Sequence, residues 1–311
     1  MSRSIKAHLL LVLMTMVWGS TFVLIKQALA DASPLVLNAV RMSLAAVLLT
    51  AYYHKQLAGL DRKAFAAGAI VGLFLFLGYA FQTTGLKLTT PSKSAFLTGV
   101  STVLVPLIMV VFWRAKTHPW RAVGITLALA GLFLMTVPAG RQGLADFAKV
   151  NRGDLLTIAC AIAFAWHIVL LGRATRCFAF EQIAVLQVAV AAALMALTAP
   201  FLEQPHFRLS VTVTATVLVT GIFGTAVAFT TQAWAQQFTP ATHTALIFTL
   251  EPVFAWLTSF LYLNERLGLR AGVGALLILS GVLVSEVLGQ VTQPDAVSPS
   301  AETPAGAGSA G

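Results

Sequence analysis

Two charged side chains lie inside long, mostly apolar stretches of the sequence. Arg41 follows Pro34 by seven residues, and Glu251 stands directly before Pro252. A guanidinium in such surroundings can bind a carboxylate or phosphate through paired hydrogen bonds, and a carboxyl group can take up and release a proton. Each residue also has a structural interpretation. Arg41 would then be an anchor bonded to carbonyl groups at a helix end, and Glu251 a hydrogen-bonded group beside a proline kink.

Neutral polar side chains form a second set of candidates. Gln82 and Gln232 need partners in apolar surroundings, so they either line a cavity or form hydrogen bonds between helices. His167 and His243 can change charge near neutral pH, with a hydrogen bond between helices as the alternative role. Gln187 has the same two interpretations as the other glutamines.

Two tryptophans, Trp18 and Trp166, correspond when the sequence is shifted by 148 positions. Trp18 stands about ten residues into its apolar stretch, away from the interfacial positions that tryptophan favours. Both are candidates for lining a cavity, with packing as the alternative. Ser20 is a further cavity candidate, and its neighbour Gly19 would let another helix approach closely.

The composition excludes a soluble globular protein. Of the 311 residues, 58% are hydrophobic and 10% are charged, against about 25% charged residues in soluble domains. The net charge of +9 comes from basic residues that stand singly between apolar runs, so no patch follows a nucleic acid backbone. Cys160 and Cys177 do not have the spacing of a disulfide framework or a zinc site, and we expect neither a metal nor a cofactor.

Ten apolar stretches carry these residues, and they predict an all-α integral membrane protein. A helix needs about 20 apolar residues to cross a bilayer, because every backbone polar group must be satisfied within the segment. The first stretch merges into a longer helical pattern, so we interpret it as a span and not as a secretory signal. The polar tail, 289–311, is predicted to be disordered. The predicted spans are 8–29, 35–53, 64–86, 93–113, 120–138, 154–172, 182–201, 211–235, 242–263 and 269–288.

The two halves of the chain correspond at a shift of 150 positions. This shift brings Gln82 onto Gln232, Gly124 onto Gly274 and Gly131 onto Gly281. Because five helices are an odd number, a second five-helix repeat must cross the membrane upside down relative to the first. We therefore predict inverted repeats over 1–138 and 154–288, joined by an external loop, 139–153. A ten-helix bundle without internal symmetry is the alternative.

The loop charges favour cytoplasmic termini. In the first half, eight basic residues lie on the face of the N-terminus and two on the opposite face, and loops rich in basic residues stay in the cytoplasm. In the second half the bias runs the other way, so the preference over the whole chain is modest. The four glycines at 124, 131, 274 and 281 recur at spacing seven on the fifth and tenth predicted helices. They predict close helix packing, with a homodimer contact as an additional role.

Several strings resemble the drug/metabolite transporter superfamily in its two-repeat, EamA-type branch. The resemblance covers about residues 5–288 in ten ordered spans. It rests on WGSTF at 18–22, FQTTGLKLTTPSKSAFLTG at 81–99, Trp166, and TALIFTLEP at 244–252 followed by LNER at 263–266. Two positions depart from the family pattern: WRAK at 113–116 lacks the acidic residue that matches Glu265, and His167 stands where a small or apolar residue is commoner.

The resemblance implies a secondary transporter, working as an exporter or exchanger in a bacterial-type inner (plasma) membrane. Such proteins move small metabolites, often amino acids or related compounds, by alternating access around a central cavity. A membrane-embedded enzyme and a channel are the alternatives. An enzyme would need a cluster of catalytic groups, whereas Glu251 is the one clear carboxylate inside the spans, so we expect no enzymatic activity. A channel would show rings of charge or a filter sequence, and an ATP-driven pump would need a phosphate-binding loop. The sequence contains none of these features.

Overall fold

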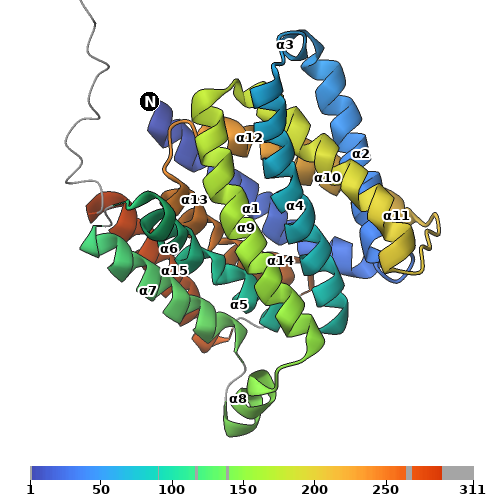
Figure 1. Ribbon diagram of the computed structural model, residues 1–311. Coiled ribbons are helices and arrows are strands. Elements are labelled where there is room, and N and C mark those ends of the chain that lie inside the picture. The colour runs from blue at the N-terminus through green and yellow to red at the C-terminus, as the bar shows by residue number, and fades with distance from the viewer. Residues whose placement is uncertain (1, 90, 116–117, 138–139, 264–267, 289–311) are drawn as a thin grey trace, which may run out of the picture.

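The computed structural model describes residues 2–89, 91–115, 118–137, 140–263 and 268–288 (Figure 1). Within this part of the chain the secondary structure is helical, apart from one isolated bridge between Ala32 and Phe207. The tail predicted to be disordered lies outside the described residues, as does Glu265. The helices are α1 (Arg3–Ala28), α2 (Pro34–Tyr52), α3 (His54–Leu57), α4 (Arg62–Leu88), α5 (Pro91–Gly99), α6 (Ser101–Trp113), α7 (Pro119–Thr136), α8 (Gly140–Ala148), α9 (Arg152–Cys177), α10 (Phe180–Leu202), α11 (Val211–Gly221), the π-helix η1 (Ile222–Val227), α12 (Ala228–Ala235), α13 (Ala241–Phe248), α14 (Glu251–Leu263) and α15 (Leu269–Leu288).

Eight helical stretches in the described residues are long and apolar enough to cross a membrane. They agree with the first eight predicted spans, although α1 and α9 are longer than predicted. The remaining two predicted spans correspond to the segments α13 and α14 and to the apolar helix α15. The predicted loop between the halves contains a short helix, α8.

Side chains at the helix ends explain where several helices begin. The Asp61 carboxylate accepts a hydrogen bond from the backbone N–H of Ala64 at 2.6 Å, at the start of α4. Asn151 and Asp154 form a reciprocal capping box at the start of α9. Such bonds satisfy N–H groups that have no partner within the helix, and this matters most where water is scarce.

Two of the predicted spans are broken in the middle. The fourth breaks at Val100 between α5 and α6, and the ninth breaks at Thr249 and Leu250 between α13 and α14. Positions 100 and 250 correspond at the shift of 150 found in the sequence. The Thr102 hydroxyl of α6 donates a hydrogen bond to the Ala245 carbonyl of α13 at 3.3 Å, so the two broken stretches touch.

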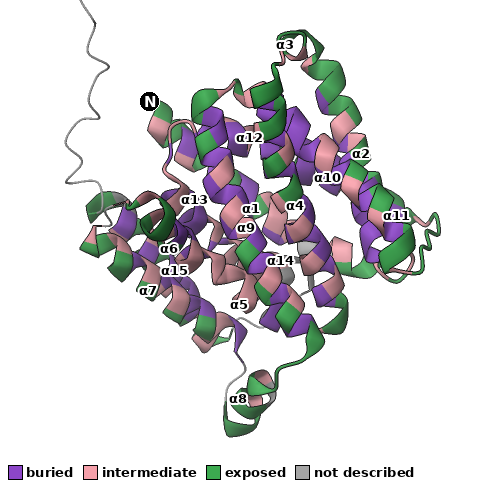
Figure 2. Cartoon of the chain, in the orientation of Figure 1, coloured by how far each residue is buried: buried purple, intermediate pink, exposed green. Residues whose placement is uncertain are grey.

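The helices pack as two groups on either side of the centre (Figure 1). In one group, apolar residues of α2, α4, α10 and α12 form a continuous core, and α9 packs along α4. In the other group, α7 and α15 pack along each other, and residues of α1 and α13 join their core. Exposed residues lie along the outer helices (Figure 2). Many of them are large and apolar, as lipid-facing surfaces require.

The predicted glycine faces bring α7 and α15 together within one chain. Gly124 faces Gly281, and Gly131 faces Gly274. A Cβ atom on Gly131 would lie 2.8 Å from Cγ1 of Ile278, which is too close for a real contact. Close helix packing is therefore confirmed as a role of these glycines, and their faces are already occupied inside the chain.

Candidate functional site

A cavity of about 360 Å³ lies between the two groups of helices. Its size falls in the range of small-molecule binding sites. Its wall comes from both halves of the chain and includes the two breaks, at Gly99 and Ser101 and at Thr249 and Glu251. Six of the nine predicted site residues line it: Trp18, Arg41, Gln82, His167, Gln232 and Glu251.

Arg41 reaches the cavity from α2 with a side chain that is only 3% exposed. Its guanidinium carbon lies 4.4 Å from the ring centroid of Tyr79, within the distance of a cation–π contact. Its Nε is buried and has no hydrogen-bond partner among the described residues. A buried donor without a partner is costly, and this one belongs to a side chain that lines the cavity.

Glu251 is the first residue of α14, directly after the break. The sequence predicted a kink beside Pro252, whereas the structure shows one helix segment ending and another beginning there. Negative charge is favoured at a helix N-terminus, where backbone N–H groups point outward. The break therefore places an acidic group at the first position of α14 and at the cavity wall.

Trp18 is held against the cavity by a hydrogen bond. Its indole N–H donates to the carbonyl of Gly224 at 2.8 Å, and its ring packs against those of Phe229 and Phe248. Gly224 belongs to the π-helix η1, and such wide turns free backbone groups that an α-helix would use internally. The local backbone thus fixes the orientation of the indole ring.

His167 and Gln232 both line the cavity and bond to other side chains. His167 Nε2 lies 2.8 Å from Oε1 of Gln187, which joins α9 to α10 as the alternative interpretation expected. Gln232 donates to Oε1 of Gln236 at 3.2 Å, and Gln236 in turn donates to the Ile168 carbonyl. Oε1 of Gln232 is buried without a partner among the described residues, so it can accept a hydrogen bond from a ligand.

Three predicted site residues lie away from the cavity wall. Trp166 packs among Phe74, Phe112 and Trp113. It points away from the cavity because successive residues of a helix are turned by about 100° about its axis, and the next residue, His167, is the one that lines the cavity. Ser20 lies off the face of Trp18 and donates to the Met16 carbonyl at 2.6 Å. His243 is buried near the ring of His8, with centroids 6.1 Å apart.

Several cavity residues escaped the sequence analysis. They include Tyr79, Phe164 and Trp256. Their signal was helical spacing: Tyr79 precedes Gln82 by three residues, Phe164 precedes His167 by three, and Trp256 follows Pro252 by four. The site is thus a cavity with aromatic walls and two groups of opposite charge. Among the described residues, no cluster of His, Cys, Asp or Glu could hold a metal ion.

The chain is similar to known proteins over most of its length. The chain is 33% identical to an uncharacterized transporter of Archaeoglobus fulgidus over 284 residues, which cover 91% of this chain and 86% of the relative. It is 22% identical to the uncharacterized transporter YoaV of Bacillus subtilis over 290 residues, covering 90% and 97% of the two chains.

A solved structure described as a crystal structure of protein matches with a TM-score of 0.74 and 19% identity, covering 91% of this chain and 97% of that one. This likeness shows the fold. The family model for EamA-like transporters matches twice, over residues 5–137 and 151–286. The chain therefore belongs to the EamA-like transporter family.

Proposed function

We propose that this membrane protein is a secondary transporter that exports or exchanges small metabolites, such as amino acids or related compounds. The observation that carries the proposal is the cavity between the two groups of helices, with walls from both halves and a helix break on each side. Broken helices around a central site are typical of carriers that work by alternating access. The names of the relatives support transport without giving a substrate.

The proposed topology has ten spans in two inverted repeats, 1–138 and 154–288, with the connecting loop 139–153 outside. Breaks at equivalent positions of the fourth and ninth spans support it, as do the two family matches. Both termini lie in the cytoplasm of a bacterial-type inner membrane in this proposal, on the basis of the loop charges. A homodimer through α7 and α15 would use their outer faces, where Val123 and Leu276 are exposed.

In this proposal the site residues have distinct roles. Arg41 binds the anionic part of the substrate, because its guanidinium is buried at the cavity without a carboxylate partner among the described residues. Gln232 accepts a hydrogen bond, and Trp18 packs against the apolar part of the substrate. Glu251 carries the coupling proton. Tyr79 lines the same cavity as Arg41 and Glu251, and its ring centroid lies 4.4 Å from the Arg41 guanidinium carbon.

Reconstitution into proteoliposomes tests the proposal. A thermal-shift screen against amino acids, nucleosides, sugars and organic cations selects a ligand, since binding stabilises the folded state. Its labelled form should then exchange across the membrane, and saturation by the unlabelled compound should slow the exchange. A steady ionic current without saturable exchange would identify a channel. Chemical conversion of the ligand would identify an enzyme, and both results would contradict the proposal.

A further inference from the structure

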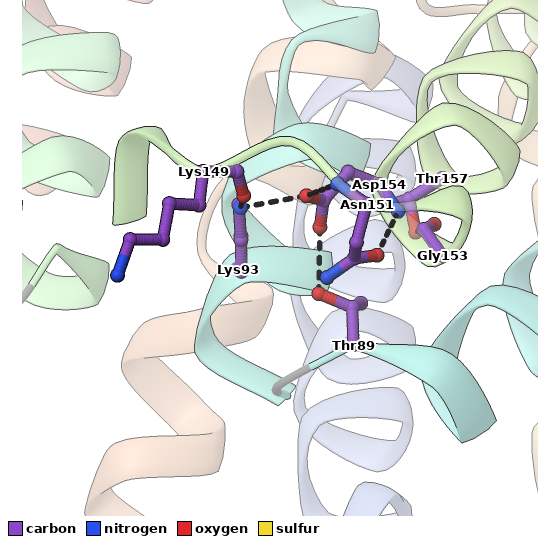
Figure 3. A network of polar contacts seen from close by, with 7 residues as sticks. All are labelled: Thr89, Lys93, Lys149, Asn151, Gly153, Asp154 and Thr157. Atoms are coloured by element: carbon purple, nitrogen blue, oxygen red, sulfur yellow. Dashed lines mark hydrogen bonds and ion pairs between the residues drawn. The ribbon is translucent and has the colours of Figure 1, made fainter. Parts of the chain in front are cut away.

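A buried ion pair joins α5 to α9 near the connection between the two halves of the chain (Figure 3). Nζ of Lys93 lies 2.6 Å from Oδ2 of Asp154, and the two side chains are 9% and 2% exposed. Lys93 lies in the first turn of α5 and Asp154 in the first turn of α9. The pair thus links a short helix segment to a long one.

The ion pair is surrounded by further polar contacts (Figure 3). The Thr89 hydroxyl donates to Oδ1 of Asp154 at 2.6 Å, and the backbone N–H of Asn151 donates to Oδ2 at 2.8 Å. Lys93 donates also to the carbonyl of Lys149. A buried ion pair is favourable only when its remaining donors and acceptors are satisfied in this way. The contacts gather the end of α4, the start of α5 and the loop before α9 at one point.

The helix α9, which contains Asp154, and the helix α4, which ends just before Thr89, cannot shift easily here. A Cβ atom on Gly85 of α4 would lie 2.8 Å from Oγ1 of Thr157, and one on Gly153 would lie 2.9 Å from the carbonyl oxygen of Gly85. Such close backbone contact fixes α4 against α9. Any relative movement at the ion pair therefore has to come from α5.

The segment α5 forms part of the cavity wall. It has nine residues, contributes Ala95, Thr98 and Gly99 to the wall, and ends at the break at Val100. A break in a helix lets one segment move as a unit while its neighbour stays in place. The ion pair holds the end of α5 that is farthest from this break.

We propose that the pair of Lys93 and Asp154 is a latch that positions α5 over one side of the cavity. Its release would open the cavity toward the side of the membrane on which α8 lies. This inference rests on the proposed alternating access, in which a carrier exposes its site to each side in turn. Lys93 and Asp154 are positioning residues, since they act on the substrate through the wall that α5 forms.

Labelling of a cavity cysteine tests the latch. Ala95→Cys is introduced into full-length protein in which Cys160→Ala and Cys177→Ser remove the native thiols. A second protein with Gln142→Cys in α8 on the same background identifies the side of the membrane. A membrane-impermeant maleimide is applied to that side. Asp154→Asn or Lys93→Met should speed labelling at position 95 about tenfold, equivalent to about 1.4 kcal/mol.

The double variant should label no faster than either single variant, because removing one partner already breaks the pair. Lys93→Arg keeps the charge and should label at the original rate. Asn151→Ala is the matched control, because it removes the side-chain cap of α9 but leaves the ion pair, and it should not change the labelling rate. If Asp154→Asn fails to fold, Lys93→Met and Lys93→Arg carry the comparison.

Equal labelling of the original protein and both single variants would overturn the inference, and so would additive effects in the double variant. Faster labelling of the single variants, together with no transport by the original protein, would support the latch and contradict the proposed function. Loss of transport in the variants, together with an unchanged labelling rate, would contradict the latch and support the proposed function. The two proposals can therefore fail separately.

Discussion

Replacement of Arg41 should separate ligand binding from structural support. Arg41→Gln removes two charge-assisted hydrogen bonds to an anionic ligand, at least about 2 kcal/mol, so affinity should fall about thirtyfold. Arg41→Lys keeps the charge but loses the planar group that lies 4.4 Å from the ring centroid of Tyr79, and affinity should fall about tenfold. The thermal stability of the ligand-free protein should not fall, because the lost cation is buried without an anionic partner among the described residues.

Binding is measured with the labelled ligand on purified protein, and exchange is measured in proteoliposomes at equal protein content. Arg173→Lys is the matched control, because the Arg173 guanidinium lies 4.5 Å from the Trp113 ring centroid outside the cavity. An uncharged amide of the ligand gives a second control, since Arg41→Gln should affect it little. Unchanged binding in both Arg41 variants, together with a lower Tm for Arg41→Gln, would show that Arg41 is an anchor and refute the reasoning.

Three further predictions follow from the coupling group, the topology and the helix packing. Glu251→Gln mimics the protonated acid, so exchange should persist while accumulation driven by a pH gradient is lost; continued accumulation would make Glu251 structural. Cysteine at Gln142 should be labelled from outside intact cells, and cysteine at Gln290 only after permeabilisation; external labelling at 290 would reverse the topology. Gly131→Ala should destabilise the protein by about 1–3 kcal/mol, seen as a lower Tm, because its Cβ meets backbone of α15. Gly59→Ala, with open space around it, should leave the Tm unchanged.

Much of the fold could be predicted because membrane spans depend on composition over about 20 residues, a range that a single sequence displays well. The breaks in the fourth and ninth spans were not predicted, although their positions correspond at the shift of 150. At each break a backbone N–H donates to a carbonyl three residues earlier, as from Val100 to Leu97 and from Leu250 to Ile247, and no pattern of residue types marks these turns. The π-helix was not predicted either, and its Gly224 carbonyl accepts a hydrogen bond from Trp18, more than 200 residues away.

The cavity residues were predicted where a polar or charged group has few other places to lie, as with Arg41 and Glu251. The prediction failed for Trp166 because neighbouring residues on a helix point in different directions, and its type alone could not select a face. Tyr79 was missed because a tyrosine is common in helix packing. Tyr79 and Gln82 share one face of α4, so Tyr79 would have been identified once Gln82 was known to line the cavity.

The contact between α7 and α15 has the reciprocity of an isologous interface. Gly124 corresponds to Gly274 and Gly131 to Gly281 at the shift of 150, and each glycine faces the counterpart of the other. In a two-fold homodimer, when position A of one copy contacts position B of the other, position B of the first copy contacts position A of the second. The fifth helix of one half therefore carries a surface complementary to itself. Because the two halves are inverted in the proposed topology, two copies of the first half, 1–138, would reproduce this contact only if they crossed the membrane in opposite directions.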